Sequence, residues 1–261
     1  MQTDRIPSDR LGNMKILKRM LLNILYVSLG VLIGLIWGVK PRETVLGIDP
    51  VPTGETSLIP GVEVTLEPQN FILAKPVSPN GTVFVYYPGG RVPAQSYEFV
   101  ARALAASGIT VAIPVMPLEL AVISPNRASE VRTALEAGGL KIVKFIVGGH
   151  SLGGAMAAKY AFSNPVDGLV LMGAYSVDDL TGKSFKVLDL AAEHDGLATP
   201  QKVKDGLGKL PPGSKVDVIS GGVHAFFGRY GPQAGDGNPT VARDVFEKDL
   251  QKRLNQYFQS L

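Results

Sequence analysis

The segment "KFIVGGHSLGGAMAAKYAF" (144–162) carries the strongest pattern in the chain. It begins as an apolar run typical of a buried strand, gathers glycines around one serine, and continues with small residues typical of a helix. Its centre, "GHSLG" (149–153), is a G-x-S-x-G motif. A strand that turns sharply into a helix brings backbone atoms close together, so glycine is needed on both sides of the turn. The segment therefore predicts a strand–turn–helix unit that exposes the Ser151 hydroxyl above a sheet edge.

Strand and helix patterns alternate on both sides of this segment. Apolar and β-branched runs predict strands over 62–67, 71–76, 82–88, 109–115, 145–149, 168–173, 186–193 and 215–220. Helical spacing of apolar residues predicts helices over 96–108, 124–139 with Ser124 as N-cap, 152–165, 199–210 and 240–261. Short buried strands that alternate with amphipathic helices indicate an α/β fold, a mostly parallel sheet with helices on both faces. We expect one such domain over 61–261.

An apolar segment precedes this domain. Residues 20–39, "MLLNILYVSLGVLIGLIWGV", contain no charge, and twenty helical residues rise about 30 Å, the thickness of a bilayer core. The sequence predicts one N-terminal transmembrane helix between a basic tail (1–19) and an extended linker (40–60). The basic tail favours a cytoplasmic N-terminus and an extracytoplasmic domain. A cleaved signal peptide, which would give a secreted protein, has a shorter apolar stretch, and a buried core helix has a polar face.

Charge and cysteine content limit the function classes. The net charge is +3, and residues 1–19, with five basic and two acidic side chains, account for all of it. The remaining chain is balanced, which gives no support for a nucleic-acid partner. The sequence contains no cysteine, so disulfides, thiolate metal ligands and a cysteine nucleophile are excluded.

A catalytic serine needs a histidine as general base. The chain has three histidines, and His224 lies in "ISGGVHAFFG", directly after the last predicted strand. A loop there brings its side chain to the carboxyl ends of the strands, so His224 is the predicted base. His150 lies inside the turn, and we expect its side chain to point away from the partner of Ser151. The alternative interpretation of the motif is a turn serine that caps the helix.

The carboxylate that orients the base is expected between the serine and the histidine. "KVLDLAAEHDG" (186–196) ends a predicted strand with two candidates, Glu193 and Asp195. Asp195 is favoured because it lies in the loop, whereas Glu193 is closer to the strand. Asp189 lies in the middle of the strand and is less suited.

Two backbone amides are expected to form an oxyanion hole. The amide of Leu152 opens the helix after the serine, where free N–H groups and the positive end of the helix dipole lie. The second donor should come from the loop "YYPGGRV" (86–92). In that loop the amide of Gly90 or Arg91 is the candidate.

The lid over the site is expected to be small. "YSVDDLTGKSF" (175–185) is too short for a cap domain between two strands. The longer loop after His224, 225–239, is expected to form one pocket wall, unless Phe226 and Phe227 pack into the core. A small lid favours short or accessible acyl groups.

Three motifs in this order resemble the small fold-5 group of the α/β-hydrolase superfamily, which is related to dienelactone hydrolases: "YYPGGRV", "GGHSLGGAMAA" and "GGVHAFFGRYGPQAGDG". The resemblance covers roughly residues 60–261 and implies a serine hydrolase without metal or organic cofactor. The roles that it implies are Ser151 as nucleophile, His224 as base, Asp195 as orienting acid, and Gly90 with Leu152 as the oxyanion hole. Dienelactone hydrolases use a cysteine nucleophile, so their substrate is not implied.

The sequence thus predicts a membrane-anchored serine hydrolase, a carboxylesterase that acts on a small-molecule ester through an acyl-enzyme. A lipase, thioesterase or acyltransferase would use the same serine chemistry. A non-catalytic binding protein of the same fold is the other alternative. A metal-dependent hydrolase built on His150, His194 and His224 lacks any ligand-spacing motif.

Overall fold

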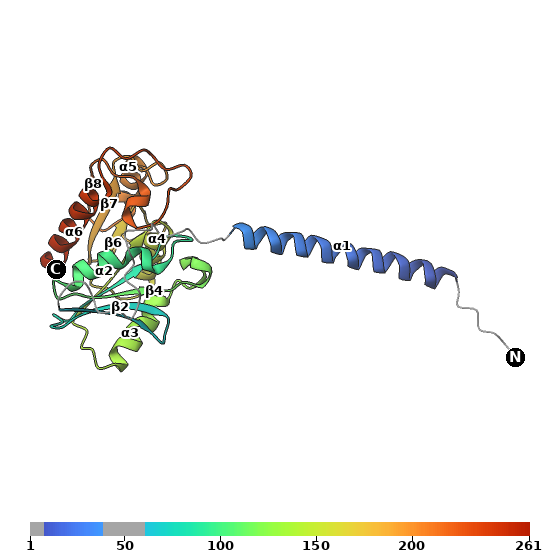
Figure 1. The fold of residues 1–261 in the computed structure, drawn as a ribbon, viewed down its shortest axis with the longest axis horizontal. Coiled ribbons are helices and arrows are strands. Elements are labelled where there is room, and N and C mark those ends of the chain that lie inside the picture. Colours follow the sequence, from blue (N-terminus) through green and yellow to red (C-terminus); the bar gives the residue numbers. More distant parts are fainter. Residues whose placement is uncertain (1–7, 39–60) are drawn as a thin grey trace. The chain divides into compact units, whose positions relative to one another are not determined.

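The computed structural model describes residues 8–38 and 61–261, which form two separate units (Figure 1). The first unit is one helix, α1 (Ser8–Gly38). The second is an α/β domain with the strands and the remaining helices. The linker predicted over 40–60 lies outside the described residues.

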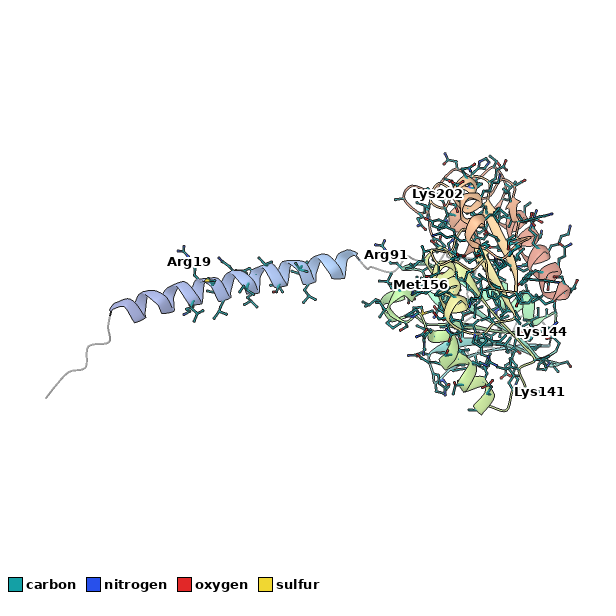
Figure 2. The ribbon with its side chains drawn as sticks, turned by 180° about the vertical axis from the view of Figure 1, so that it is seen from behind. Arg19, Arg91, Lys141, Lys144, Met156 and Lys202 are labelled. Atoms are coloured by element: carbon teal, nitrogen blue, oxygen red, sulfur yellow. The ribbon has the colours of Figure 1, made fainter. Side chains whose placement is uncertain are left out.

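Helix α1 is 31 residues long and begins inside the segment expected to be a basic tail. Its stretch Leu17–Gly34 has a mean hydropathy of 1.5 and is long and apolar enough to cross a membrane. None of these residues is buried, so their side chains stand without protein cover (Figure 2). This exposure does not fit a core helix, while a membrane anchor and a signal sequence both fit it.

The domain is built on an eight-stranded sheet with the order β1-β2-β4-β3-β5-β6-β7-β8. Its strands are β1 (Val62–Glu67), β2 (Phe71–Pro76), β3 (Thr82–Tyr87), β4 (Thr110–Pro114), β5 (Lys144–His150), β6 (Gly168–Met172), β7 (Lys186–Ala192) and β8 (Val216–Ile219). Strand β2 is antiparallel to both of its neighbours, and the other strands are parallel. The mostly parallel sheet is therefore confirmed, and each predicted strand end lies within one residue of the observed end.

Helices cover both faces of the sheet (Figure 1). The α-helices of the domain are α2 (Glu98–Ala105), α3 (Arg127–Ala137), α4 (Leu152–Ser163), α5 (Pro200–Asp205) and α6 (Arg243–Ser260). Short 3-10 helices are η1 (Ala94–Tyr97), η2 (Pro117–Glu119), η3 (Ala121–Ile123), η4 (Gly206–Lys209) and η5 (His224–Phe227). Side chains of α2 and α6 pack on one face, and those of α3 and α4 on the other. Both faces of the central strands are therefore buried, which explains their continuous apolar runs.

The start of α3 differs from the prediction. Ser124 was expected as the N-cap, but the helix begins at Arg127. The Tyr87 hydroxyl, at the end of β3, accepts a hydrogen bond from the Ala128 amide at 2.8 Å and donates one to the Pro125 carbonyl at 2.8 Å. A side chain from the sheet thus satisfies an amide of the first helical turn. The residues around Ser124 give no sign of this contact, because Tyr87 is distant in the sequence.

Strand β7 carries a buried carboxyl group, Asp189. Its side chain is 1% exposed, and neither carboxyl oxygen has a hydrogen-bond partner among the described residues. Burial raises the pKa of Asp189 to about 8, because the charged form loses its hydration. Asp189 therefore holds a proton at neutral pH in the folded protein.

This burial predicts a pH-dependent stability. The folded pKa of Asp189 lies above the unfolded value of about 4, so the folded state binds the proton more tightly. The contribution of Asp189 to the free energy of unfolding should fall as the pH rises from about 4 to 8. In Asp189→Asn, which cannot ionise, the stability relative to the wild type should rise by about 3–4 kcal/mol between pH 5 and pH 8, since each pH unit contributes about 1.4 kcal/mol. Urea unfolding at several pH values measures it.

Asp205→Asn is the control for this prediction, because Asp205 is exposed. It shows what the loss of one exposed carboxylate alone does to the same urea profiles. Parallel pH profiles for Asp189→Asn and the wild type would contradict the raised pKa.

Candidate active site

Ser151 occupies the turn between β5 and α4. Its backbone has φ 54° and ψ −126°, a left-handed conformation that residues other than glycine rarely adopt. Such strain persists where the surrounding structure enforces it, and it clusters at functional sites. The sharp turn predicted from G-x-S-x-G is present at this position.

The turn has no room for side chains at its two glycines. A Cβ atom on Gly153 would lie 2.3 Å from the Pro88 carbonyl oxygen, and one on Gly149 would lie 2.8 Å from the Gly153 carbonyl carbon. Real Cβ atoms essentially never approach so closely. The absence of side chains here lets α4 start directly against the end of β3.

His224 and Asp195 lie next to each other at the carboxyl ends of the strands. The distance from His224 Nδ1 to Asp195 Oδ2 is 2.6 Å, and both side chains are buried. The other carboxylate oxygen, Oδ1, accepts hydrogen bonds from the amides of Leu197 (2.8 Å) and Ala198 (2.7 Å). These bonds fix the carboxylate so that it accepts the proton of Nδ1.

The other acidic candidates point elsewhere. Glu193 Oε2 accepts a hydrogen bond from the Gly221 amide at 2.7 Å. Asp189 lies in the middle of β7, away from the turn after the strand. The structure therefore brings Asp195, of the three acidic candidates, into contact with His224.

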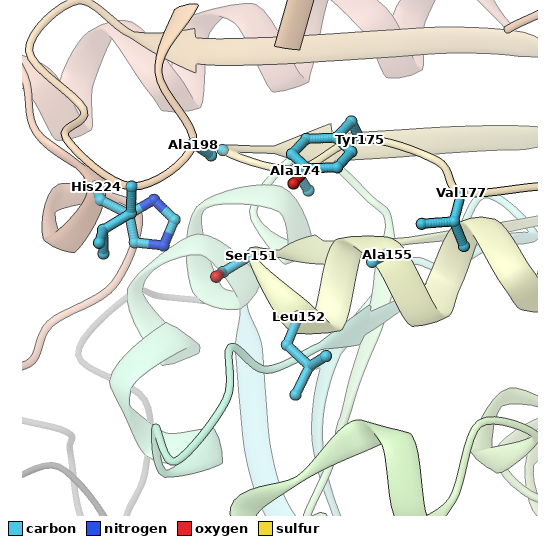
Figure 3. Close-up of a pocket in the computed structure, with 10 residues that line it drawn as sticks. Ser151, Leu152, Ala155, Ala174, Tyr175, Val177, Ala198 and His224 are labelled. Carbon is cyan, nitrogen blue, oxygen red and sulfur yellow. The ribbon is translucent and has the colours of Figure 1, made fainter. Parts of the chain in front are cut away.

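A cavity of about 340 Å³ opens between Ser151 and His224. His224 Nε2 has no hydrogen-bond partner within the part of the chain that the structure describes. Figure 3 shows the Ser151 hydroxyl and the His224 ring at one end of the cavity. Most of the other lining residues are apolar: Leu152, Ala155, Gly173, Ala174, Tyr175, Val177, Leu197 and Ala198.

The walls of the cavity differ from the expected ones. The prediction that 225–239 forms a wall is wrong, because no lining residue comes from that loop: the walls come from the start of α4 and from the segments after β6 and β7. Phe226 and Phe227 are buried in the core on the α6 side of the sheet. In the described domain no helix lies between β6 and β7, which agrees with a small lid.

The loop after β3 presents one unused amide beside Leu152. The amide of Arg91 donates to the Glu119 carbonyl at 2.7 Å, and that of Gly89 donates to the Tyr97 hydroxyl at 3.0 Å. Within the described residues no hydrogen bond uses the Gly90 amide. A Cβ atom on Gly90 would lie 3.1 Å from Leu152 Cδ2, so Gly90 and Leu152 adjoin. Of the two candidates in this loop, Gly90 has the available donor.

Asp236 is part of the site architecture and was not predicted. Its carboxylate accepts hydrogen bonds from the amides of His224 (3.0 Å), Ala225 (2.9 Å) and Gly196 (3.3 Å). One side chain thus ties the loop of the base to the loop of the acid. In the sequence Asp236 appears as an ordinary turn residue in "AGDG", so only its contacts reveal the role.

The orientation expected for His150 is wrong. Its ring centroid lies 4.4 Å from that of His224, and the two rings pack against each other. Alternation along β5 places His150 on the same face as Ile146, which belongs to the core on the α2 and α6 side. His224 approaches the serine from that side too, so the two imidazoles meet.

The sheet order and the serine turn at the end of β5 define the α/β class of hydrolases. Residues 83–248 match a family model described as the alpha/beta hydrolase family. The match covers more than half of the chain, and the protein belongs to this family of hydrolases.

Solved structures share the fold at low sequence identity. An alpha-beta serine hydrolase homologue from Coxiella burnetii is 16% identical, with a TM-score of 0.56 over 79% of this chain and 98% of that chain. A predicted CIB-like hydrolase from Thermoplasma acidophilum is 15% identical, with a TM-score of 0.55 over 75% and 98%. Carboxyl esterase 2 from Tuber melanosporum is 16% identical, with a TM-score of 0.50 over 82% and 90%. The comparison with curated proteins finds no match.

The crowded turn predicts that Gly153→Ala is strongly destabilising. The new methyl group would meet the Pro88 carbonyl oxygen at 2.3 Å, and overpacking of this kind costs about 1–3 kcal/mol. We expect a lower melting temperature and a displaced Ser151. Gly208→Ala is the matched control, since nothing lies within 4 Å of its Cβ position. Equal melting temperatures for the two variants would contradict the steric account.

Proposed function

We propose that the protein is a serine hydrolase of carboxylic esters, with Ser151 as nucleophile, His224 as general base and Asp195 as the orienting acid. The observation that carries the proposal is the 2.6 Å contact between His224 Nδ1 and Asp195. It leaves the opposite ring nitrogen, Nε2, for the proton of Ser151, which lines the same cavity. The strained backbone of Ser151 supports the same role.

The reaction proceeds by acyl transfer. His224 Nε2 takes the Ser151 proton while Oγ attacks the ester carbonyl carbon. The amides of Leu152 and Gly90 donate hydrogen bonds to the oxyanion of the tetrahedral intermediate. As the intermediate collapses, Nε2 returns the proton to the leaving alcohol, and the acyl group stays on Ser151. Water then attacks the acyl-enzyme with His224 again as base, which releases the carboxylic acid.

The lining of the cavity supports a substrate with an apolar group. The lining contains no Asp, Glu, Lys or Arg, and His224 is its one histidine. Burying a charged group there would cost more than burying an alkyl or aryl group. Because the lid is small, short or accessible esters fit the site best.

Helix α1 is proposed as a membrane anchor, with its N-terminus in the cytoplasm and the catalytic domain outside. Its apolar stretch Leu17–Gly34 supports this role. The basic residues of the preceding segment support the orientation. The chain would then bind a small-molecule ester through its domain and the bilayer through α1.

Ser151→Ala tests the catalytic proposal. If the three residues act as a unit, the variant should lose on the order of 10⁶ in kcat on an ester that the wild type cleaves. A fluorophosphonate should label the wild type at Ser151 and leave the variant unlabelled. Ser163→Ala, an exposed serine at the end of α4, is the control and should keep both properties. An unlabelled wild type would refute the proposal. If the wild type is labelled, a panel of esters and thioesters of increasing chain length ranks its substrates.

Membrane fractionation tests the anchor. The intact chain should remain in the membrane pellet after an alkaline wash, because an apolar helix of this length stays in the bilayer. Mass spectrometry should find residues 1–19 still present. A soluble chain that has lost them would identify a cleaved signal sequence instead.

A further inference from the structure

A chain of hydrogen bonds joins the serine turn to the loop after β3. The Gly89 amide donates to the Tyr97 hydroxyl at 3.0 Å, and this hydroxyl lies 2.9 Å from His150 Nδ1. Tyr97 and His150 are 0% and 1% exposed. A Cβ atom on Gly89 would lie 2.8 Å from the hydroxyl and 2.9 Å from Nδ1. The Gly89 backbone therefore packs directly on this buried pair.

The Tyr97 hydroxyl can make both bonds at once. Its oxygen accepts the Gly89 amide, and the same hydroxyl is hydrogen-bonded to His150 Nδ1. Either Tyr97 or His150 Nδ1 can be the donor of the second bond, according to the tautomer of the imidazole. The tyrosine thus links an amide of one loop to an imidazole of the other.

The two ends of this link lie beside the two proposed oxyanion donors. Gly89 directly precedes Gly90, and His150 is two residues before Leu152. On its other side the loop is held by the Arg91 amide, which donates to the Glu119 carbonyl at 2.7 Å. The Gly90 amide therefore lies between Gly89 and Arg91, whose own amides are both held by hydrogen bonds.

His150 also supports the catalytic imidazole. Its ring centroid is 4.4 Å from His224 and 5.5 Å from Phe227. Tyr97 in turn packs on Tyr86, with ring centroids 4.8 Å apart. One cluster of rings thus contacts the base and holds the oxyanion loop.

We propose that Tyr97 and His150 are positioning residues that fix the Gly90 amide relative to Leu152 and hold the ring of His224. This inference rests on the proposed serine hydrolase function. The oxyanion exists only in the transition state and the tetrahedral intermediates, so the link acts on kcat and not on ground-state binding. A displacement of about 1 Å in such a site costs up to about 100-fold in rate.

Tyr97→Phe removes the hydroxyl and keeps the ring. We expect kcat to fall about 10- to 100-fold with KM within about twofold of the wild type. The affinity for a boronic acid, which forms a tetrahedral adduct on the serine, should fall by a similar factor. Tyr257→Phe is the matched control: it removes a buried hydroxyl that donates to the Lys186 carbonyl at 2.9 Å, at the start of β7. It should leave kcat and the boronic acid affinity unchanged.

Substitutions of His150 test the other half of the link. Asn places an amide group near the position of Nδ1 and can hydrogen-bond to the Tyr97 hydroxyl, whereas Leu cannot. His150→Asn should retain more kcat than His150→Leu. The kcat of the double variant Tyr97→Phe/His150→Leu should be about equal to that of the less active single variant, because both substitutions break the same Tyr97–His150 hydrogen bond.

Hydrogen exchange separates this inference from the proposed function. The Gly89 amide should exchange faster in Tyr97→Phe than in the wild type and in Tyr257→Phe. Unchanged exchange at Gly89, or wild-type kcat and boronic acid affinity in Tyr97→Phe, would overturn the positioning role. A wild type that neither reacts with fluorophosphonate nor cleaves esters would remove the proposed function and, with it, the catalytic part of this inference, even where exchange at Gly89 still responds.

Discussion

The close approach of α4 to the end of β3 is the constraint on which the rest of the site depends. With no side chain on Gly153, the helix starts within contact distance of the Pro88 carbonyl. The chain can then reverse within one residue, and Ser151 takes the left-handed backbone conformation of the turn. The same closeness sets Leu152 beside Gly90. The absence of side chains at Gly149 and Gly153 thus decides where Ser151 and the amides of Leu152 and Gly90 lie.

Electrostatics then fixes the remaining groups. A buried carboxylate is costly unless its oxygens are hydrogen-bonded, and Asp195 meets this need with two amides and His224. The Asp236 carboxylate is satisfied in the same way, since it accepts hydrogen bonds from amides in the loops of both His224 and Asp195. Asp189 shows the contrasting case: with no partner among the described residues, it carries a raised pKa.

The sequence was most informative where one local rule decides the structure. Strand periodicity located all the strands of the sheet, and the glycine spacing located the turn of Ser151, because each depends on neighbours in the chain. It was least informative where distant elements meet. The cap of α3 comes from Tyr87 on β3, and Asp236 acts on loops far from it in sequence. For His150 the sequence prediction failed because it considered the turn alone and not the face of β5 on which the ring lies.

Contacts between α6 and the loop of His224 make the proposed site dependent on this helix. Arg243, in the first turn of this last helix, donates to the carbonyls of Ala225 (3.0 Å) and Gly228 (2.5 Å). The loop that carries His224 therefore depends on the packing of α6 against the sheet. A nascent or truncated polypeptide that lacks α6 would carry Ser151 without the contacts that order the loop of His224. Under the proposed mechanism, such a polypeptide would be inactive.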